Sequence, residues 1–177
     1  LLSMLLLAEA GYRVFVHGCD GHTEGRLYTE QAMRELGLPV AQSWQQVEQQ
    51  LETEKLSYLP VRAFCPELHQ LIQLRPLLGL RSPVNTLTRM LNPARAQASL
   101  QSIFHPAYAR LHQEADKLLG QPAATVFKGE SGEVELKPNA DTKLYRLLDA
   151  SSEEVQLPRT IDARVTDVET PGTAPLS

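Results

Sequence analysis

The sequence is poor in several residue types, and each shortage excludes a class of protein. It has two cysteines among 177 residues, Cys19 and Cys65, which is too few for a secreted disulfide scaffold and favours a reducing, cytoplasmic setting. No apolar run approaches the ~20 residues of a membrane-spanning helix, so we expect no membrane partner. The chain also lacks a Walker loop, a Gly-x-Ser-x-Gly motif, a redox cysteine pair and an internal repeat, which leaves nucleophilic catalysis without support.

The composition is that of an ordinary globular protein. Hydrophobic residues make up 42% of the chain and charged residues 21%, close to the average for soluble domains. Apolar segments of strand and helix type alternate up to about residue 148, which predicts an α/β domain with a mixed, largely parallel sheet flanked by helices. Strands are expected at 13–16, 56–60, 99–104, 124–128, 134–136 and 143–147. Residues 149–177 are acidic and contain Pro and Gly, and we expect them to form a disordered tail.

The first ten residues are strongly apolar and carry Glu9 without a basic leader. This composition predicts a core helix rather than a signal peptide. Because the chain also does not begin with Met, we expect it to be a piece of a longer protein whose domain is incomplete at its N-terminus.

Charge is unevenly distributed along the chain. The net charge is −4, yet the segment 60–110 has one acid, Glu67, and no lysine. It contains six arginines: Arg62, Arg75, Arg81, Arg89, Arg95 and Arg110. Such a run could form a face that binds nucleic-acid phosphates, for which arginine is well suited. The alternative is an ordinary solvated surface of several helices.

A polar loop with metal-capable side chains follows the first predicted strand. It contains His17, Gly18, Cys19 and His22. The residues themselves leave two interpretations open: a zinc site, which would need about four ligands, and a simple glycine-containing turn. Between these two we favour the turn, because no second cluster of standard spacing completes a zinc site.

Three stretches of the sequence form a motif pattern. They are Val16-His17-Gly18, the segment from Pro66 to Asn85 with Arg75, Gly79 and Arg81, and Asn92-Pro93-Ala94. With these stretches, residues 12–137 resemble the C-terminal α/β domain of anthranilate phosphoribosyltransferase-like proteins, glycosyltransferase family 3. The resemblance implies the nucleoside phosphorylase/phosphoribosyltransferase type of fold. It implies substrate contacts from His17, Gly18, Cys19 and Arg75. For the loop of His17 and Gly18 it therefore adds a third interpretation, an altered substrate pocket, which is the one we favour. It also implies a homodimer formed through a helical domain that, like the glycine-rich diphosphate loop, lies before Leu1.

The sequence departs from the family pattern at several positions. Val16 stands where the family has a lysine and Cys19 where it has an asparagine. Thr88-Arg89-Met90 replaces Gly-Pro-Leu, and Glu133-Val134 replaces a magnesium-binding Asp-Glu pair. Together with Phe127-Lys128-Gly129, these features resemble the YbiB-like branch, whose members bind nucleic acid.

The leading hypothesis is therefore sequence-independent binding of nucleic acid. The residues predicted to make the contacts are Arg75, Arg81, Arg89, Arg95, Arg110 and Lys128. The alternative is a magnesium-dependent phosphoribosyltransferase, in which Glu130 and Glu133 would help to hold the ion. Without the acidic pair we predict no bound metal and no cofactor. A purely structural role without retained activity is the third possibility.

Overall fold

Two short parallel strands and a mixed four-stranded sheet form the centres of two units, Leu1–Ala96 and Gln97–Ser177. The computed structural model describes residues 1–20, 27–79, 83–129 and 134–161. The first unit contains α1 (Leu2–Glu9), β1 (Val14–Gly18), α2 (Thr29–Glu35), α3 (Trp44–Thr53), β2 (Leu56–Pro60), α4 (Val61–Phe64), α5 (Pro66–Gln73), α6 (Arg75–Leu78), α7 (Val84–Leu87) and the 3-10 helix η1 (Thr88–Met90). The second contains β3 (Ala98–Ile103), the 3-10 helix η2 (Pro106–Tyr108), α8 (Ala109–Leu118), β4 (Ala123–Lys128), β5 (Thr142–Leu148) and β6 (Ser151–Leu157).

Alternation along β1 and β2 produces the two apolar faces of the first unit. Side chains on one face of the strand pair, such as Val16 and Tyr58, pack with Met33 of α2. Those on the opposite face, such as Phe15 and Leu59, belong to a second cluster with α3. Because successive side chains of a strand point to opposite faces, five residues per strand suffice for both clusters.

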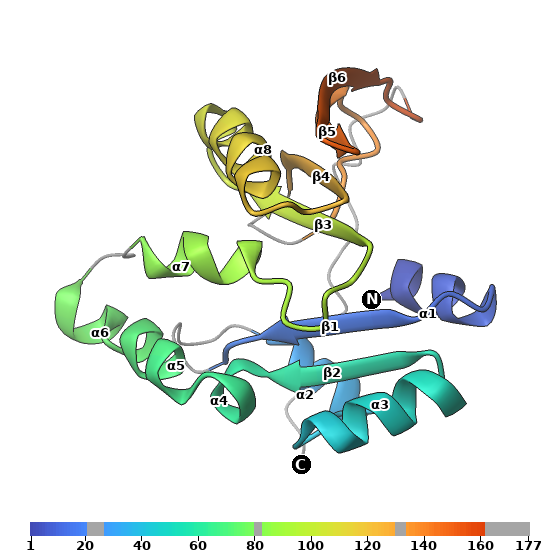
Figure 1. Cartoon of the computed structure of the whole chain (residues 1–177), viewed down its shortest axis with the longest axis vertical. Helices are drawn as coiled ribbons and strands as arrows, with labels where there is room; N and C mark the ends of the chain where they lie inside the picture. The colour runs from blue at the N-terminus through green and yellow to red at the C-terminus, as the bar shows by residue number, and fades with distance from the viewer. Residues whose placement is uncertain (21–26, 80–82, 130–133, 162–177) are drawn as a thin grey trace, which may run out of the picture. The chain divides into compact units, whose positions relative to one another are not determined.

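Local sequence signals explain where the helices of the first unit begin and end. Ser43 precedes α3, and its hydroxyl accepts a hydrogen bond from the Gln46 backbone amide at 3.3 Å, as N-cap residues do. Pro76 has no backbone N–H, and α5 ends at Gln73 shortly before it. Gly79 ends α6 at φ +67°, a conformation that glycine adopts without strain. The short helices α4–α7 therefore follow one another beyond the carboxyl ends of β1 and β2 (Figure 1).

The sheet of the second unit has the strand order β3-β4-β5-β6. β3 and β4 are parallel and joined through α8, whereas β4–β5 and β5–β6 are antiparallel. Ile103, Ala109 and Val126 form the buried apolar cluster between the sheet and α8. The predicted mixed α/β class is thus confirmed, with parallel and antiparallel pairs in the same sheet.

The predicted strand at 134–136 is wrong, because residues 134–136 are irregular. The predicted start of the disordered tail at 149 is wrong for residues 151–157, which form β6 and pair with β5. The two strands are joined by Asp149 and Ala150, both at positive φ, as in a type I′ hairpin turn. The usual Asn-Gly signal for such a turn is absent here, which is why the hairpin escaped the sequence analysis. Residues 162–177 lie outside the described structure.

Within the described ranges, none of the helices has the length and apolar character needed to cross a bilayer.

Candidate functional site

The loop predicted to bind substrate begins where β1 ends, at the carboxyl edge of the parallel strand pair. His17 lies opposite Leu59 and Gly18 opposite Pro60, so both strands end at this edge. In parallel α/β structures, ligands characteristically bind at this edge. The side-chain amide of Gln73, on α5, donates to the Asp20 carbonyl oxygen at 2.7 Å and so fixes the described part of the loop.

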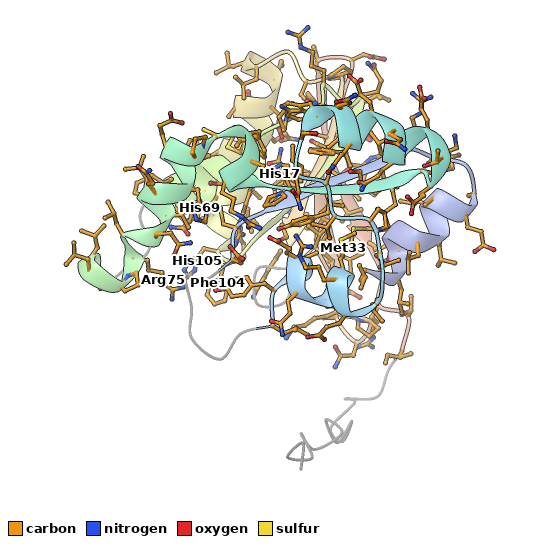
Figure 2. The ribbon with its side chains drawn as sticks, turned by 90° about the horizontal axis from the view of Figure 1, so that it is seen from below. His17, Met33, His69, Arg75, Phe104 and His105 are labelled. Carbon is orange, nitrogen blue, oxygen red and sulfur yellow. The ribbon has the colours of Figure 1, made fainter. Side chains whose placement is uncertain are left out.

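His17 is held as a neutral imidazole. Its Nε2 lies 3.0 Å from the Leu91 carbonyl oxygen, and because a carbonyl only accepts, Nε2 carries the proton. Burial lowers the pKa of His17, and the Leu91 hydrogen bond opposes this only in part. The Nδ1 atom is buried and has no hydrogen-bond partner among the described residues. The ring packs edge-on against Phe64 at 5.8 Å, and Figure 2 labels its position.

Gly18 is closely covered by the side chain of Tyr58. A Cβ atom at position 18 would lie 2.9 Å from the Tyr58 hydroxyl oxygen, closer than nonbonded carbon and oxygen atoms approach. Tyr58 is 2% exposed, and burial is the main cause that raises its pKa. Gly18 therefore serves a packing requirement of the loop.

The two departures from the family pattern make this loop less polar. The side chain of Val16 packs into the cluster of Met33, Leu56 and Tyr58, where a lysine would bury its charge. Burial, followed by the neighbouring Asp20 carboxylate, raises the pKa of Cys19 to about 12. The thiol is therefore protonated at neutral pH and does not act as a thiolate nucleophile.

Arg62 forms a bidentate ion pair beside this loop, and its partners lie outside the arginine-rich segment. Its Nη1 and Nη2 atoms donate to Oε2 and Oε1 of Glu30 at 2.7 and 2.6 Å, and Nη1 also approaches Asp20 at 3.4 Å. The Glu30 side chain is 7% exposed, and the Arg62 hydrogen bond is the main cause of its lowered pKa. The sequence analysis missed this network, since nothing local pairs residues 32 positions apart.

Three of the predicted nucleic-acid contacts lie in the first unit, on consecutive short elements. Arg75 is the half-buried first residue of α6 (Figure 2), and Arg89 is half-buried in η1. Arg95 is exposed at φ +49°, in a turn where the Asn92 side chain bonds both the amide and the carbonyl of Ala96 at 2.7 and 2.8 Å. The predicted contact Arg81 lies outside the described residues.

The other predicted contacts belong to the second unit. Arg110 donates to Glu154 of β6 at 2.6 and 3.0 Å, and Lys143 shares the same carboxylate at 3.0 Å. Lys128 is exposed at the end of β4. The arginine-rich segment is thus divided between the two units. Arg62 and Arg110 also form ion pairs with acidic residues that lie outside the segment 60–110 and were not part of its charge count.

The described residues contain no group of three or more His, Cys, Asp or Glu side chains that could hold an ion. His22, needed for the zinc interpretation, and Glu130 and Glu133, the alternative magnesium ligands, lie outside the described residues.

Elsewhere in the second unit, the buried side chains of Gln101, His112 and Asp116 satisfy one another. The Gln101 amide nitrogen lies 2.8 and 2.9 Å from the two Asp116 carboxylate oxygens, and its oxygen accepts from His112 Nδ1 at 2.9 Å. Burial raises the pKa of Asp116. This network joins β3 to α8 and is structural.

Comparison with known proteins agrees with this architecture. The family described as "Glycosyl transferase family, a/b domain" matches residues 1–162. The chain is 27% identical over 155 residues to anthranilate phosphoribosyltransferase from Ralstonia pickettii (strain 12J), covering 88% of this chain and 45% of that protein. It is 30% identical over 140 residues to protein YbiB from Escherichia coli (strain K12), covering 77% and 43%. The crystal structure of anthranilate phosphoribosyltransferase from Thermus thermophilus has a TM-score of 0.70 and 25% identity, covering 89% of this chain and 46% of that one.

The chain spans just under half the length of these three proteins. The family match extends over both units and includes the β1 loop and the arginine-bearing elements. The chain belongs to the glycosyl transferase family, whose α/β domain it represents.

Proposed function

We propose that this chain binds nucleic acid through the phosphate backbone, without sequence specificity, and that it is a diverged member of its family. One observation carries the proposal: α6, η1 and the turn after η1 bear Arg75, Arg89 and Arg95, and the sequence from 68 to 113 contains no acidic residue. Arginines without interleaved acids create a positive potential, and each phosphate they neutralise releases a counterion. Contacts of this kind carry no base information.

The altered β1 loop supports binding rather than catalysis. An acceptor site needs polar groups that hold and orient the substrate, whereas Val16 is packed in the core and Cys19 is a protonated thiol. The Arg62 guanidinium beside the loop is engaged by Glu30 and Asp20.

The test is a fluorescence-anisotropy titration of the protein with labelled single- and double-stranded DNA across a salt series. The triple variant Arg75→Gln, Arg89→Gln, Arg95→Gln should bind all sequences more weakly. Its slope of log affinity against log salt should become shallower by up to about three on duplex DNA, since each phosphate contact contributes roughly 0.9.

A matched control removes the same charge elsewhere: Arg13→Gln, Lys55→Gln, Lys117→Gln. These residues lie before β1, after α3 and in the last turn of α8. The control should keep the slope of the unmodified protein. An unchanged slope in the first variant, or an equal loss in the control, would show that these arginines are not the binding site.

A magnesium-dependent phosphoribosyltransferase is the second candidate, favoured by the relatives of that name that match across 88% of this chain. In this case His17 and Arg75 would hold the acceptor, and Glu133 would contribute to the metal. Pyrophosphate release from phosphoribosyl diphosphate and an aromatic amine, dependent on Mg²⁺ and abolished by Arg75→Gln, would support it. Absence of pyrophosphate release from the full-length protein, together with salt-dependent DNA binding, would exclude the transferase in favour of the first candidate. The homodimer and the cytoplasmic location stay predictions.

A further inference from the structure

We propose that three rings following β3, those of Phe104, His105 and Tyr108, form a platform on which unpaired bases stack, so that the second unit takes single-stranded nucleic acid. This inference rests on the proposed nucleic-acid binding and specifies the form that is bound. We call these three residues the ring platform.

The rings of the platform are exposed and contact one another. Phe104 is 52% exposed and Tyr108 49% exposed. The His105 ring lies edge-on to Phe104 at 4.8 Å and 6.3 Å from Tyr108. Neighbouring apolar rings that face water forgo the stabilisation of burial, and such patches characteristically mark interaction sites.

The aromatic ring of Phe64 has different surroundings. Phe64, the other phenylalanine of the arginine-rich segment 60–110, is half-buried in a cluster with His17 and Trp44. Its ring is occupied by protein neighbours, and we assign it to packing. The difference in exposure follows from position in the fold. Phe64 comes after β2 and packs against the cluster that includes Val47 of α3, whereas the ring platform lies between β3 and α8.

Flat, solvated rings match the chemistry of nucleic-acid bases. Every base has a π face, and stacking on an aromatic side chain contributes about 1–3 kcal/mol per base irrespective of sequence. Within a duplex these faces are covered by the neighbouring base pairs. The ring platform therefore selects unpaired strands, which an arginine surface alone does not distinguish.

Cationic side chains lie on other elements of the second unit, namely Lys128 on β4, Arg110 on α8 and Lys143 on β5. Lys128 is exposed at the end of β4, opposite Ile103, the residue before Phe104. The Gly129 amide donates to the Ile103 carbonyl at 3.2 Å and ties this edge together. Arg110 follows Tyr108 by two residues and shares Glu154 with Lys143, so two cations face one carboxylate. The local excess of positive charge suits a phosphate backbone passing beside the rings.

The test compares the protein with Phe104→Leu, Tyr108→Leu, a double variant that keeps apolar bulk and removes the π faces. The probes are fluorescein-labelled oligo-dT of about 20 nucleotides, a duplex of the same length, and an abasic strand of the same length, enough to cover a site of several nucleotides. Oligo-dT affinity should fall about tenfold or more in the variant, while the affinities for the duplex and for the abasic strand stay unchanged. Tyr12→Leu is the matched control, because Tyr12 is 64% exposed in the first unit, and it should bind like the unmodified protein.

A second readout does not depend on the variant's folding. The fluorescence of 2-aminopurine in an oligo-dT strand should be quenched when the unmodified protein binds, as expected for a base stacked on a ring. Undiminished oligo-dT affinity in the folded variant, or bound 2-aminopurine without quenching, would overturn the ring platform. If salt-dependent binding persisted in that case, the proposed function would stand. Binding of no probe at low salt would overturn both.

Discussion

Gly18 lies against the hydroxyl of Tyr58, and this contact restricts the loop after β1 to a residue without a side chain. Gly18→Ala would place its methyl group 2.9 Å from that oxygen, and because Tyr58 is buried it has little room to move. We expect a loss of about 1–3 kcal/mol in the free energy of unfolding, as for other overpacked sites. Urea denaturation measures it.

The double variant Gly18→Ala, Tyr58→Phe is the control for this contact. It removes the oxygen and leaves ring carbons at 3.7 Å from the new methyl, an ordinary van der Waals distance. Gly18→Ala should then lower the free energy of unfolding by less in the Tyr58→Phe protein than in the protein that keeps Tyr58. Equal costs in both backgrounds would assign the effect of Gly18→Ala to another cause.

Glu30 makes a pH-dependent contribution through Arg62. Its pKa is lowered in the folded protein, so its contribution is complete above the unfolded pKa of about 4.3 and is lost as pH falls through the folded pKa. Glu30→Gln should lower the free energy of unfolding by about 1–3 kcal/mol at neutral pH, the usual value of charged hydrogen bonds.

The measurement compares the two proteins by urea denaturation from neutral pH down to about pH 3. The difference in unfolding free energy between the two proteins should narrow as pH falls below about 4.3, because Glu30 then binds a proton in the unfolded state more readily than in the folded state, where its pKa is lowered. Glu35→Gln, an exposed change in the same helix, is the matched control and should leave the unfolding free energy nearly unchanged. A gap that does not vary with pH would contradict the ion pair.

At the scale of elements, β6 is part of the sheet and not the start of a tail. It pairs with β5 from Ser151 to Leu157, and its Glu154 binds Arg110 of α8. A chain ending at Ala150 should therefore melt at a lower temperature than a chain ending at Ile161, which keeps the strand. Thermal unfolding followed by circular dichroism measures the difference, and equal melting temperatures would show that β6 contributes nothing to stability.

Element types were largely predictable, because their signals are local. Ser43, Pro76 and Gly79 act within one helical turn of their own positions. The β5–β6 hairpin could not be predicted in this way, since Asp149-Ala150 adopts positive φ without the residues that favour it.

At the scale of the whole molecule, the two units have separate cores. Leu59 is fully buried in the first unit and Val126 in the second. Leu59→Ala should cost about 2–5 kcal/mol and accelerate amide hydrogen exchange in β1 and β2, with little effect in β4 and β5. Val126→Ala should accelerate amide hydrogen exchange in β4 and β5, with little effect in β1 and β2. Equal acceleration in both sheets after either change would show that the chain unfolds as one cooperative unit.

The sequence by itself determined most of the strands, the mixed α/β class and the family, because periodicity, caps and motif spacing are properties of short segments. Only the tertiary structure decided which charged side chains form ion pairs and which aromatic rings are packed against other side chains. Arg62 meets Glu30 and Arg110 meets Glu154 across 32 and 44 positions, and Phe64 is packed where Phe104 is exposed. Contacts between residues far apart in the chain depend on how strands and helices are brought together, and no local pattern records them.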